Sequence, residues 1–212
     1  MKKTFGLFLC YCCAAILFSS CSSQPGSNSS EEMQAPIQPL SCIAVLPVRT
    51  SVNQDTTIDY AKAQSLQDGA VYATDVINRE LQGNPRVLFV TSSQVDSLVS
   101  QVTGGVSGTV GALGQKLKCD GVLLTTVSRF QQREGTEYSA DSPASVDFSM
   151  VLRHSGQGNI LWSADFREEQ ESFLSNILSF TKAKNRGFKW VSAEQLLEQG
   201  IIERLEDCPY LQ

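Results

Sequence analysis

The hydrophobic pattern changes its period once along the chain, and this change limits the fold more than any other feature. Three short apolar runs, at 42–48, 87–90 and 122–127, alternate with longer stretches whose apolar residues recur every three or four positions. Apolar runs of this length indicate strands buried on both faces, and the longer spacing indicates amphipathic helices. The pattern in the first part of the domain therefore predicts a parallel βαβαβ unit with right-handed crossovers.

From residue 145 onward, apolar and polar residues alternate one by one. One apolar set lies at 146–152 and a second at 160–166, with a turn at 154–159 between them. A period of two predicts an antiparallel hairpin with one buried face. We therefore expect an α/β fold with a mixed sheet, in which a parallel βαβαβ start is followed by an antiparallel hairpin and helices flank the sheet.

Local signals place the helix ends. A long helix over 59–81 is expected to stop at the Gly-Asn-Pro sequence of 83–85, and Ser92 or Ser93 is expected to cap the next helix. The glycine-rich stretch 103–108 follows a helix and lacks the Lys-Ser/Thr ending of a phosphate loop, so it is interpreted as a joint between helices. Near the end of the chain, helices are expected at 173–180 and 192–207, and Ser192 begins the last one with a capping box.

The first forty residues indicate export and tethering. Lys2 and Lys3 precede an apolar run at 5–18, which is shorter than the roughly twenty residues that a membrane-spanning helix needs. We therefore expect a signal peptide over 1–20. Residues 22–40 are rich in Ser, Pro, Gly and Gln and cannot bury enough apolar surface to order themselves. The predicted organisation is a signal peptide, a lipidated flexible tether over 21–40 and a single α/β domain over 41–212.

The end of the leader, Leu-Phe-Ser-Ser-Cys at 17–21, resembles the lipobox of bacterial lipoproteins. Phe18 stands where an aliphatic residue is usual. The resemblance implies cleavage before Cys21 and acylation of its thiol and its new amino group, and two or three acyl chains hold a protein stably on a membrane. Ser22 is not the aspartate that enteric bacteria use for inner-membrane retention, so the resemblance implies an outer-membrane anchor with the domain facing the periplasm. The alternative is an ordinary secretory signal cut nearby, with Cys21 as an unmodified thiol.

Three further cysteines lie outside the leader and the lipobox: Cys42, Cys119 and Cys208. Two of them can pair in an oxidising compartment, and the odd number leaves one over. If the strands that follow Cys42 and Cys119 are neighbours, both cysteines lie at the same end of the sheet. Cys42–Cys119 is therefore the preferred disulfide, with Cys208 as the competing partner and buried thiols as the remaining alternative. The single histidine, His154, has no cysteine or carboxylate at ligand spacing, so neither a metal nor a cofactor is expected.

The chain is acidic, with a formal charge of −5 over all 212 residues. Nucleic acid is a poor partner for such a protein, because its binding is driven by cationic contacts to phosphate. The segment 180–190 differs, since it has four cations and no acid and contains these candidate contact residues: Lys182, Lys184, Arg186, Phe188, Lys189 and Trp190. Cations beside aromatic rings suit a lipid headgroup layer, an acidic partner or an anionic polymer. The alternative is that Phe188 and Trp190 pack the last helix onto the core while the lysines face water.

No catalytic constellation is evident in the sequence. Catalysis needs a nucleophile beside a base, or paired carboxylates in a shaped pocket. His154 lies in a predicted turn, and Ser155 followed by Gly156 is turn chemistry without the G-x-S-x-G pattern of a nucleophile elbow. The acidic residues at 168–171 are interpreted as a solvated face. We therefore predict a binding protein rather than an enzyme.

Three stretches resemble one family: Ile-Ala-Val-Leu-Pro-Val at 43–48, the helix-to-strand passage at 113–124, and Gly-Asn-Ile-Leu-Trp-Ser at 158–163. Together they look like the envelope lipoproteins built on the fold of the TolB amino-terminal domain, over roughly residues 41–170. That group includes lipoproteins of curli secretion and Pel polysaccharide export and outer-membrane activators of peptidoglycan synthases. The resemblance implies a noncatalytic structural or accessory component of an envelope export or assembly system, or alternatively an activator of a peptidoglycan synthase. The implied partners are the membrane, through the lipid, and envelope proteins or further copies of the chain.

Overall fold

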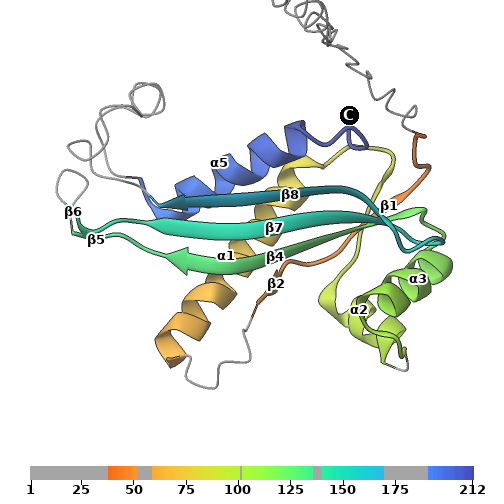
Figure 1. Ribbon diagram of the computed structural model, residues 1–212, viewed down its shortest axis with the longest axis horizontal. Helices are drawn as coiled ribbons and strands as arrows, with labels where there is room; N and C mark the ends of the chain where they lie inside the picture. Colours follow the sequence, from red (N-terminus) through yellow and green to blue (C-terminus); the bar gives the residue numbers. More distant parts are fainter. Residues whose placement is uncertain (1–37, 52–58, 101, 136–139, 170–190) are drawn as a thin grey trace, which may run out of the picture. The chain divides into compact units, whose positions relative to one another are not determined.

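Six strands of the described residues form one mixed sheet (Figure 1). The structure is a computed structural model, and it describes residues 38–51, 59–100, 102–135, 140–169 and 191–212. The strand order is β3-β1-β4-β7-β8, with β2 paired to β4 off this path. The strands are β1 (Ile43–Val45), β2 (Arg49–Thr50), β3 (Val87–Phe89), β4 (Gly121–Gln131), β7 (Ser145–His154) and β8 (Ile160–Glu169).

The strand directions confirm the predicted mixed sheet. Strands β3, β1 and β4 are mutually parallel, while β7 is antiparallel to both β4 and β8. The strands that match the three predicted apolar runs, β1, β3 and β4 in chain order, thus lie in the spatial order β3-β1-β4. A short hairpin of β5 (Glu134–Gly135) and β6 (Ala140–Ser142) forms a separate two-stranded sheet that the sequence analysis did not predict.

Pro47 divides the first predicted strand into two pieces. Both pieces, β1 and β2, run parallel to β4. Because proline has no N–H to donate to a ladder, a central strand cannot continue regularly through it. The next N–H, of Val48, donates to Oγ1 of Thr74 in a helix at 3.0 Å. Within the apolar run 42–48, the regular strand therefore covers only Ile43–Val45 and ends before Pro47.

Two helices cover one face of the sheet and enclose the larger core. They are α1 (Tyr60–Glu80) and α5 (Ala193–Glu206), which lie behind the sheet in Figure 1. Under them, the rings of Phe148 and Phe166 stack with centroids 5.2 Å apart. A Cβ on Gly200 of α5 would come within 2.8 Å of the Phe166 ring. Glycine at this position therefore lets α5 approach the sheet closely enough to bury the aromatic pair.

Two other helices, α2 (Ser92–Val99) and α3 (Gly105–Leu117), enclose a smaller core on the opposite face. The cap predicted for α2 is wrong, because Thr91 caps it instead of Ser92 or Ser93. The Thr91 hydroxyl accepts the N–H of Gln94 at 3.3 Å, and the Gln94 side chain accepts the N–H of Thr91 at 2.8 Å. Thr91 has the extended backbone that an N-cap requires, whereas Ser92 is already helical.

The joint predicted over 103–108 is shorter than expected, because α3 already begins at Gly105. The ends predicted for the other two described helices agree with the structure. The long helix α1 ends before the Gly-Asn-Pro sequence, and α5 begins with the predicted capping box of Ser192 and Gln195. The predicted helix at 173–180, the leader and most of the tether lie outside the described residues. Within the described part of the chain, no helix combines the length and the apolar character that crossing a membrane would require.

Candidate interaction surfaces

The predicted tether enters the domain at a well-fixed junction. Leu40 is buried, and its Cδ1 lies against Gly121 at the start of β4. The backbone N–H of Ser41 donates to Oδ2 of Asp120 at 2.9 Å, and the Ser41 hydroxyl donates to the same oxygen. The carbonyl of Cys42 accepts the N–H groups of Asp120 and Gly121, both at 3.0 Å. These contacts join residues 40–42 directly to β4 in the middle of the sheet.

A disulfide closes the same junction. Cys42 and Cys119 are bonded, with their Cα atoms 4.5 Å apart, and they are 77 residues apart in the sequence. This is the pairing that the sequence analysis preferred, and it follows from β1 and β4 being neighbours. Cys208, the competing partner, is a free and fully buried thiol near the end of α5, where burial raises its pKa.

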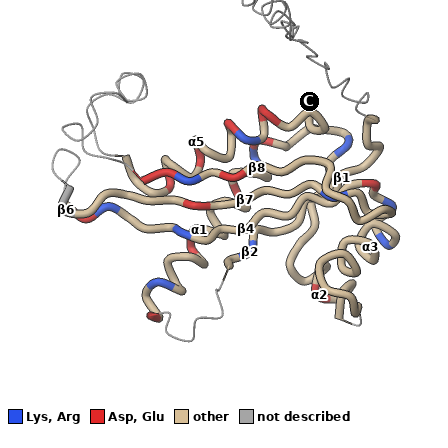
Figure 2. The backbone as a smooth tube through the Cα atoms, in the orientation of Figure 1, with Lys and Arg blue, Asp and Glu red and all other residues tan. Residues whose placement is uncertain are grey.

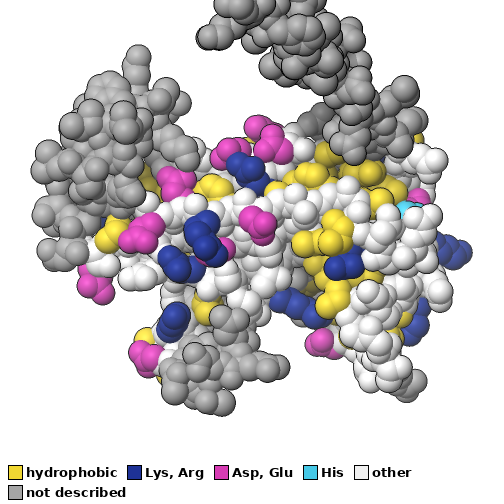
Figure 3. Space-filling view, in the orientation of Figure 1, with side chains coloured by type: hydrophobic (Ala, Val, Ile, Leu, Met, Phe, Trp, Pro, Cys, Tyr) yellow, Lys and Arg dark blue, Asp and Glu magenta, His cyan; other side chains and the backbone are white. Residues whose placement is uncertain are grey.

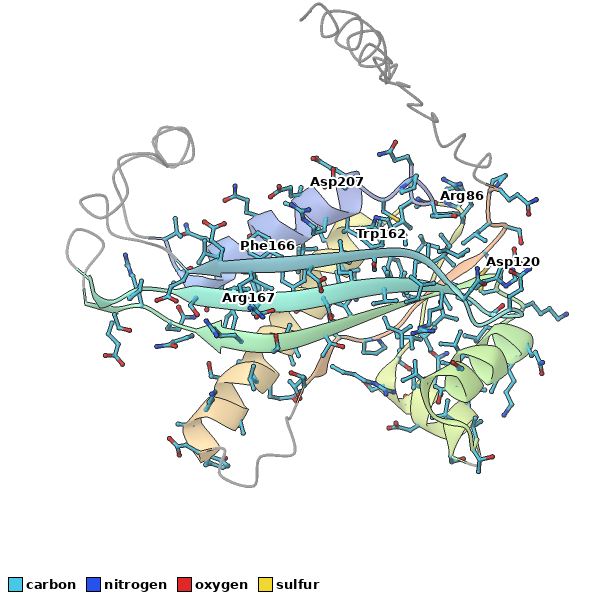
Figure 4. All side chains as sticks on the ribbon, viewed as in Figure 1. Arg86, Asp120, Trp162, Phe166, Arg167 and Asp207 are labelled. Carbon is cyan, nitrogen blue, oxygen red and sulfur yellow. A yellow bond between two sulfur atoms is a disulfide. The ribbon has the colours of Figure 1, made fainter. Side chains whose placement is uncertain are left out.

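Asp120 is the charged residue of the junction. The hydrogen bonds from the side chain and the backbone of Ser41 lower the pKa of its carboxyl group, because both bonds favour the charged form. Its own carbonyl accepts the N–H of Ser155 at 2.7 Å. Asp120 therefore connects the tether entry with the turn between β7 and β8 (Figure 4).

The β7–β8 turn packs tightly on α3 at this end. Ser155 donates its hydroxyl to the carbonyl of Cys119 at 2.7 Å, and a Cβ on Gly114 of α3 would lie 2.0 Å from the Cβ of Ser155. His154 ends β7, and its Nδ1 accepts the N–H groups of Gly156 at 3.0 Å and Gln157 at 3.2 Å. The turn predicted here is present, and His154 contributes to its geometry.

The second surface is an open sheet face. Helices α2 and α3 pack near β1, β3 and the start of β4, and no described element lies in front of the rest of that face in Figure 1. In the space-filling view, basic and acidic side chains lie side by side on it (Figure 3). Side chains from β4, β7 and β8 form rows across it in register, and we define the open sheet face by these residues: Thr126, Arg129, Asp147, Ser149, Val151, Ser163, Asp165 and Arg167. All eight are exposed or half-buried, while the alternate residues of the same strands line the larger core.

A bulge in β4 determines which charges reach the open sheet face. The pairing of β4 with β7 shifts between Val127 and Arg129, so that Ser128 is the extra residue. The shift directs Arg129 to the open side and Phe130 into the core, where regular alternation would do the reverse. Arg129 thereby joins the row of Asp147 and Arg167.

The strongest ion pair of this face joins neighbouring strands. Nε of Arg167 lies 2.6 Å from Oδ2 of Asp147, whose side chain is 16% exposed, whereas that of Arg167 is 76% exposed. Such a pair contributes little to stability at a wet surface, because water and salt screen it. It holds the Arg167 side chain across β7 (Figure 4) and keeps opposite charges side by side on the face.

The outer face of α5 forms a shallow acidic groove. Its lining is Gln195, Glu198, Gln199, Ile202, Glu203 and Glu206. Glu198 accepts from Nη2 of Arg79 at 2.5 Å and from the hydroxyl of Tyr72 at 2.9 Å, both on α1. Burial, and then the bond to Glu198, raise the pKa of Tyr72. These contacts hold α5 against α1, and we assign the groove no ligand.

The remaining predicted site residues lie outside the described residues. These are the lipidation site Cys21 and the contact segment with Lys182, Lys184, Arg186, Phe188, Lys189 and Trp190. Their roles stay predictions. Among the described residues, no three His, Cys, Asp or Glu side chains lie close enough together to hold a metal ion.

No protein-family model and no curated protein matches the chain. Solved structures similar to the chain include a PelC dodecamer from Paraburkholderia phytofirmans, 12% identical, with a match that covers 81% of this chain and 87% of that chain at a TM-score of 0.46. Lipoprotein GNA1162 from Neisseria meningitidis is 17% identical, with coverage of 69% and 97% and a TM-score of 0.41. The LpoB C-terminal domain from Escherichia coli is 15% identical, with coverage of 64% and 88% and a TM-score of 0.39.

These likenesses concern the fold alone. The group that the sequence resembles includes a Pel export lipoprotein and other envelope lipoproteins. PelC and a lipoprotein are among the solved structures that match this chain. The predicted resemblance is confirmed at that level.

Proposed function

We propose that the chain is a lipid-anchored, noncatalytic accessory protein of the bacterial envelope, which faces the periplasm from the outer membrane and binds a protein partner through its open sheet face. The lipobox ending at Cys21 supports the anchor, and the Ser- and Pro-rich tether supports reach from the membrane. The partner belongs to an envelope export or assembly system.

The observation that carries this proposal is the unequal covering of the sheet. One face is sealed by α1 and α5, while three long strands present a charged and partly apolar surface on the other. The stacked Phe148 and Phe166 rings lie in the core on the other side of these strands. An exposed sheet surface of mixed polarity suits a protein interface, because such interfaces combine apolar and charged contacts.

A photocrosslinking experiment tests the open sheet face. A photoreactive amino acid replaces Ser163, which is exposed on strand β8 of the face, in the acylated protein within its own membranes. The matched control replaces Val71, which is 54% exposed on α1 and lies on the other side of the sheet. We expect a discrete crosslinked partner from position 163 and none from position 71. Equal crosslinking from both positions, or from neither, would overturn the assignment of this face.

The identity of the crosslinked partner separates the functions that the proposal includes. An export component, or a further copy of the chain, supports the accessory role in export or assembly. A one-to-one complex with a peptidoglycan synthase supports the activator function instead. The anchor is tested separately by mass spectrometry of the amino terminus, and an unmodified terminus on a protein in the soluble fraction would refute it.

A further inference from the structure

The end of the domain where the tether enters is cationic, in contrast to the rest of an acidic protein (Figure 2). We define the tether end as the residues that surround the junction in register: 40–43, 86–87, 116–121 and 153–160. These ranges contain four cations, Arg86, Lys116, Lys118 and Arg153, and one acid, Asp120, so their formal charge is +4 − 1 = +3. Helix α1 has two cations and three acids, and α5 has one cation and four acids, so together they have a formal charge of −4.

Lys118 adds an independent observation. Its φ is +56°, and it is the one described residue other than glycine with a positive φ. It follows α3 in the left-handed conformation that glycine adopts most easily at a helix C-terminus. A lysine here costs backbone strain that glycine would avoid, and strain of this kind concentrates at functional positions. Its side chain is exposed beside the disulfide.

Two aliphatic side chains are exposed near the β7–β8 turn. Ile160, at the start of β8, is 52% exposed, and Val106, in the first turn of α3, is 56% exposed. The turn meets α3 there, because a Cβ on Gly158 would lie 4.0 Å from the Cβ of Ser107, whereas Lys116 is in the last turn of the same helix. Ile160 belongs to the tether end, and an exposed aliphatic residue on a cationic end of a domain suits a lipid headgroup boundary.

We propose that the tether end docks on anionic lipid headgroups of the membrane that holds the anchor, through Lys116, Lys118 and Ile160. This inference rests on the proposed lipid anchor. The predicted tether between Cys21 and the first described residue has a root-mean-square length of about 23 Å as a flexible chain, so the domain stays near the surface and a weak attraction suffices. The negative potential of the headgroups turns the cationic end toward the membrane and the acidic α5 away from it.

The test uses the acylated protein in two kinds of vesicle, phosphatidylcholine alone and phosphatidylcholine with phosphatidylglycerol. Lysines are labelled with an amine-reactive reagent at low salt and quantified by mass spectrometry. We expect labelling of Lys118 to fall about fivefold in the anionic vesicles, the factor that corresponds to the attraction of one lysine near such a surface. Lys62, exposed on α1, is the control within the same molecule and should be unchanged. High salt should restore the labelling of Lys118.

Two variants and one control are compared in a second assay. A polarity-sensitive dye is attached to a cysteine introduced by Gln157→Cys in the β7–β8 turn, and a blue shift of its emission reports contact with lipid. Lys116→Glu/Lys118→Glu should abolish the blue shift of the dye in anionic vesicles, while the matched variant Lys62→Glu should keep it. Lys118→Gly should weaken docking and yet raise the unfolding midpoint, because glycine relieves the strained backbone. A loss of docking through misfolding would lower that midpoint instead.

The outcomes separate this inference from the anchor on which it rests. Protein that floats with the vesicles but shows the same Lys118 labelling in both lipids overturns the docking and leaves the anchor intact. Protection that is equal in neutral vesicles and insensitive to salt also overturns it, since no charge recognition is then involved. Protein that fails to float with either kind of vesicle refutes the anchor itself.

Discussion

Reducing the disulfide between Cys42 and Cys119 should destabilise the domain through the unfolded state. The bond constrains a loop with a sequence separation of 77 residues. In the chain-entropy relation, a loop of this size removes about 15 cal/mol/K from the unfolded ensemble, which corresponds to about 4.5 kcal/mol at 25 °C. If the free energy of unfolding falls by about 2 kcal/mol per molar urea, the urea concentration at the midpoint of unfolding should fall by about 2 M on reduction.

The measurement compares one protein in two redox states. The acylated chain is unfolded by urea in detergent with and without dithiothreitol, so that no side chain is lost from the junction. The Cys42→Ala/Cys119→Ala variant should resemble the reduced protein and be insensitive to dithiothreitol. Cys208→Ala is the control, because Cys208 is free and buried, and its variant should keep the full response to reduction.

Two results would refute this reasoning. Equal midpoints for the oxidised and reduced chains would show that the crosslink does not constrain the unfolded state as calculated. Alkylation of Cys42 and Cys119 in the denatured but unreduced protein would show that the bond is not formed at all. A larger urea dependence in the reduced protein, by contrast, is expected, because its unfolded chain is less compact.

Three further predictions concern single side chains. Thr91→Ala should lower the free energy of unfolding by about 1 kcal/mol through loss of the α2 cap, whereas Ser92→Ala should change it by less than about half of that, as measured by urea unfolding. Gly114→Ala should lower the free energy of unfolding by about 1–3 kcal/mol more than Gly111→Ala in the same helix. A Cβ at position 114 would meet Ser155 and a backbone oxygen within 3 Å, whereas a Cβ at position 111 would have its nearest neighbour at 3.6 Å. Thermal unfolding of both variants tests this difference. Asp120→Asn should destabilise the domain at neutral pH, because a carboxylate with a lowered pKa stabilises the fold while it is charged. The effect should vanish as the pH falls from about 3.9, the ordinary pKa of aspartate, through the lower pKa of the folded state. The unfolding midpoints of the variant and the unchanged protein should therefore converge across this pH range.

The period of the hydrophobic pattern was sufficient to predict the sheet. The buried runs around Ile43 and Val122 had the length and composition of covered parallel strands, and the alternation through Phe148 had the period of a half-covered one. Because side-chain period and burial are coupled directly by backbone geometry, these assignments needed no tertiary information. The neighbouring cysteines followed from the same strand order.

Features that depend on tertiary contacts could not be predicted. Thr91 and Ser92 are both acceptable caps by residue type, and the path of the chain after β3 decides between them. The bulge at Ser128 has no sequence signal, and without it Arg129 would have been assigned to the core face. The left-handed backbone of Lys118 could not be predicted from its residue type, because lysine rarely adopts this conformation. The open sheet face could not be predicted either, because it depends on α2 and α3 covering only part of one side of the sheet.

The position of the disulfide also determines where mechanical load travels. A pull on the chain before Cys42 passes through a covalent bond to Cys119, two residues before the long strand β4. The three-residue strand β1 is bypassed, so it cannot be peeled from the sheet one hydrogen bond at a time. Force is instead borne by β4, which shares its length with β7 in shear. A domain under such a load would thus keep its shape.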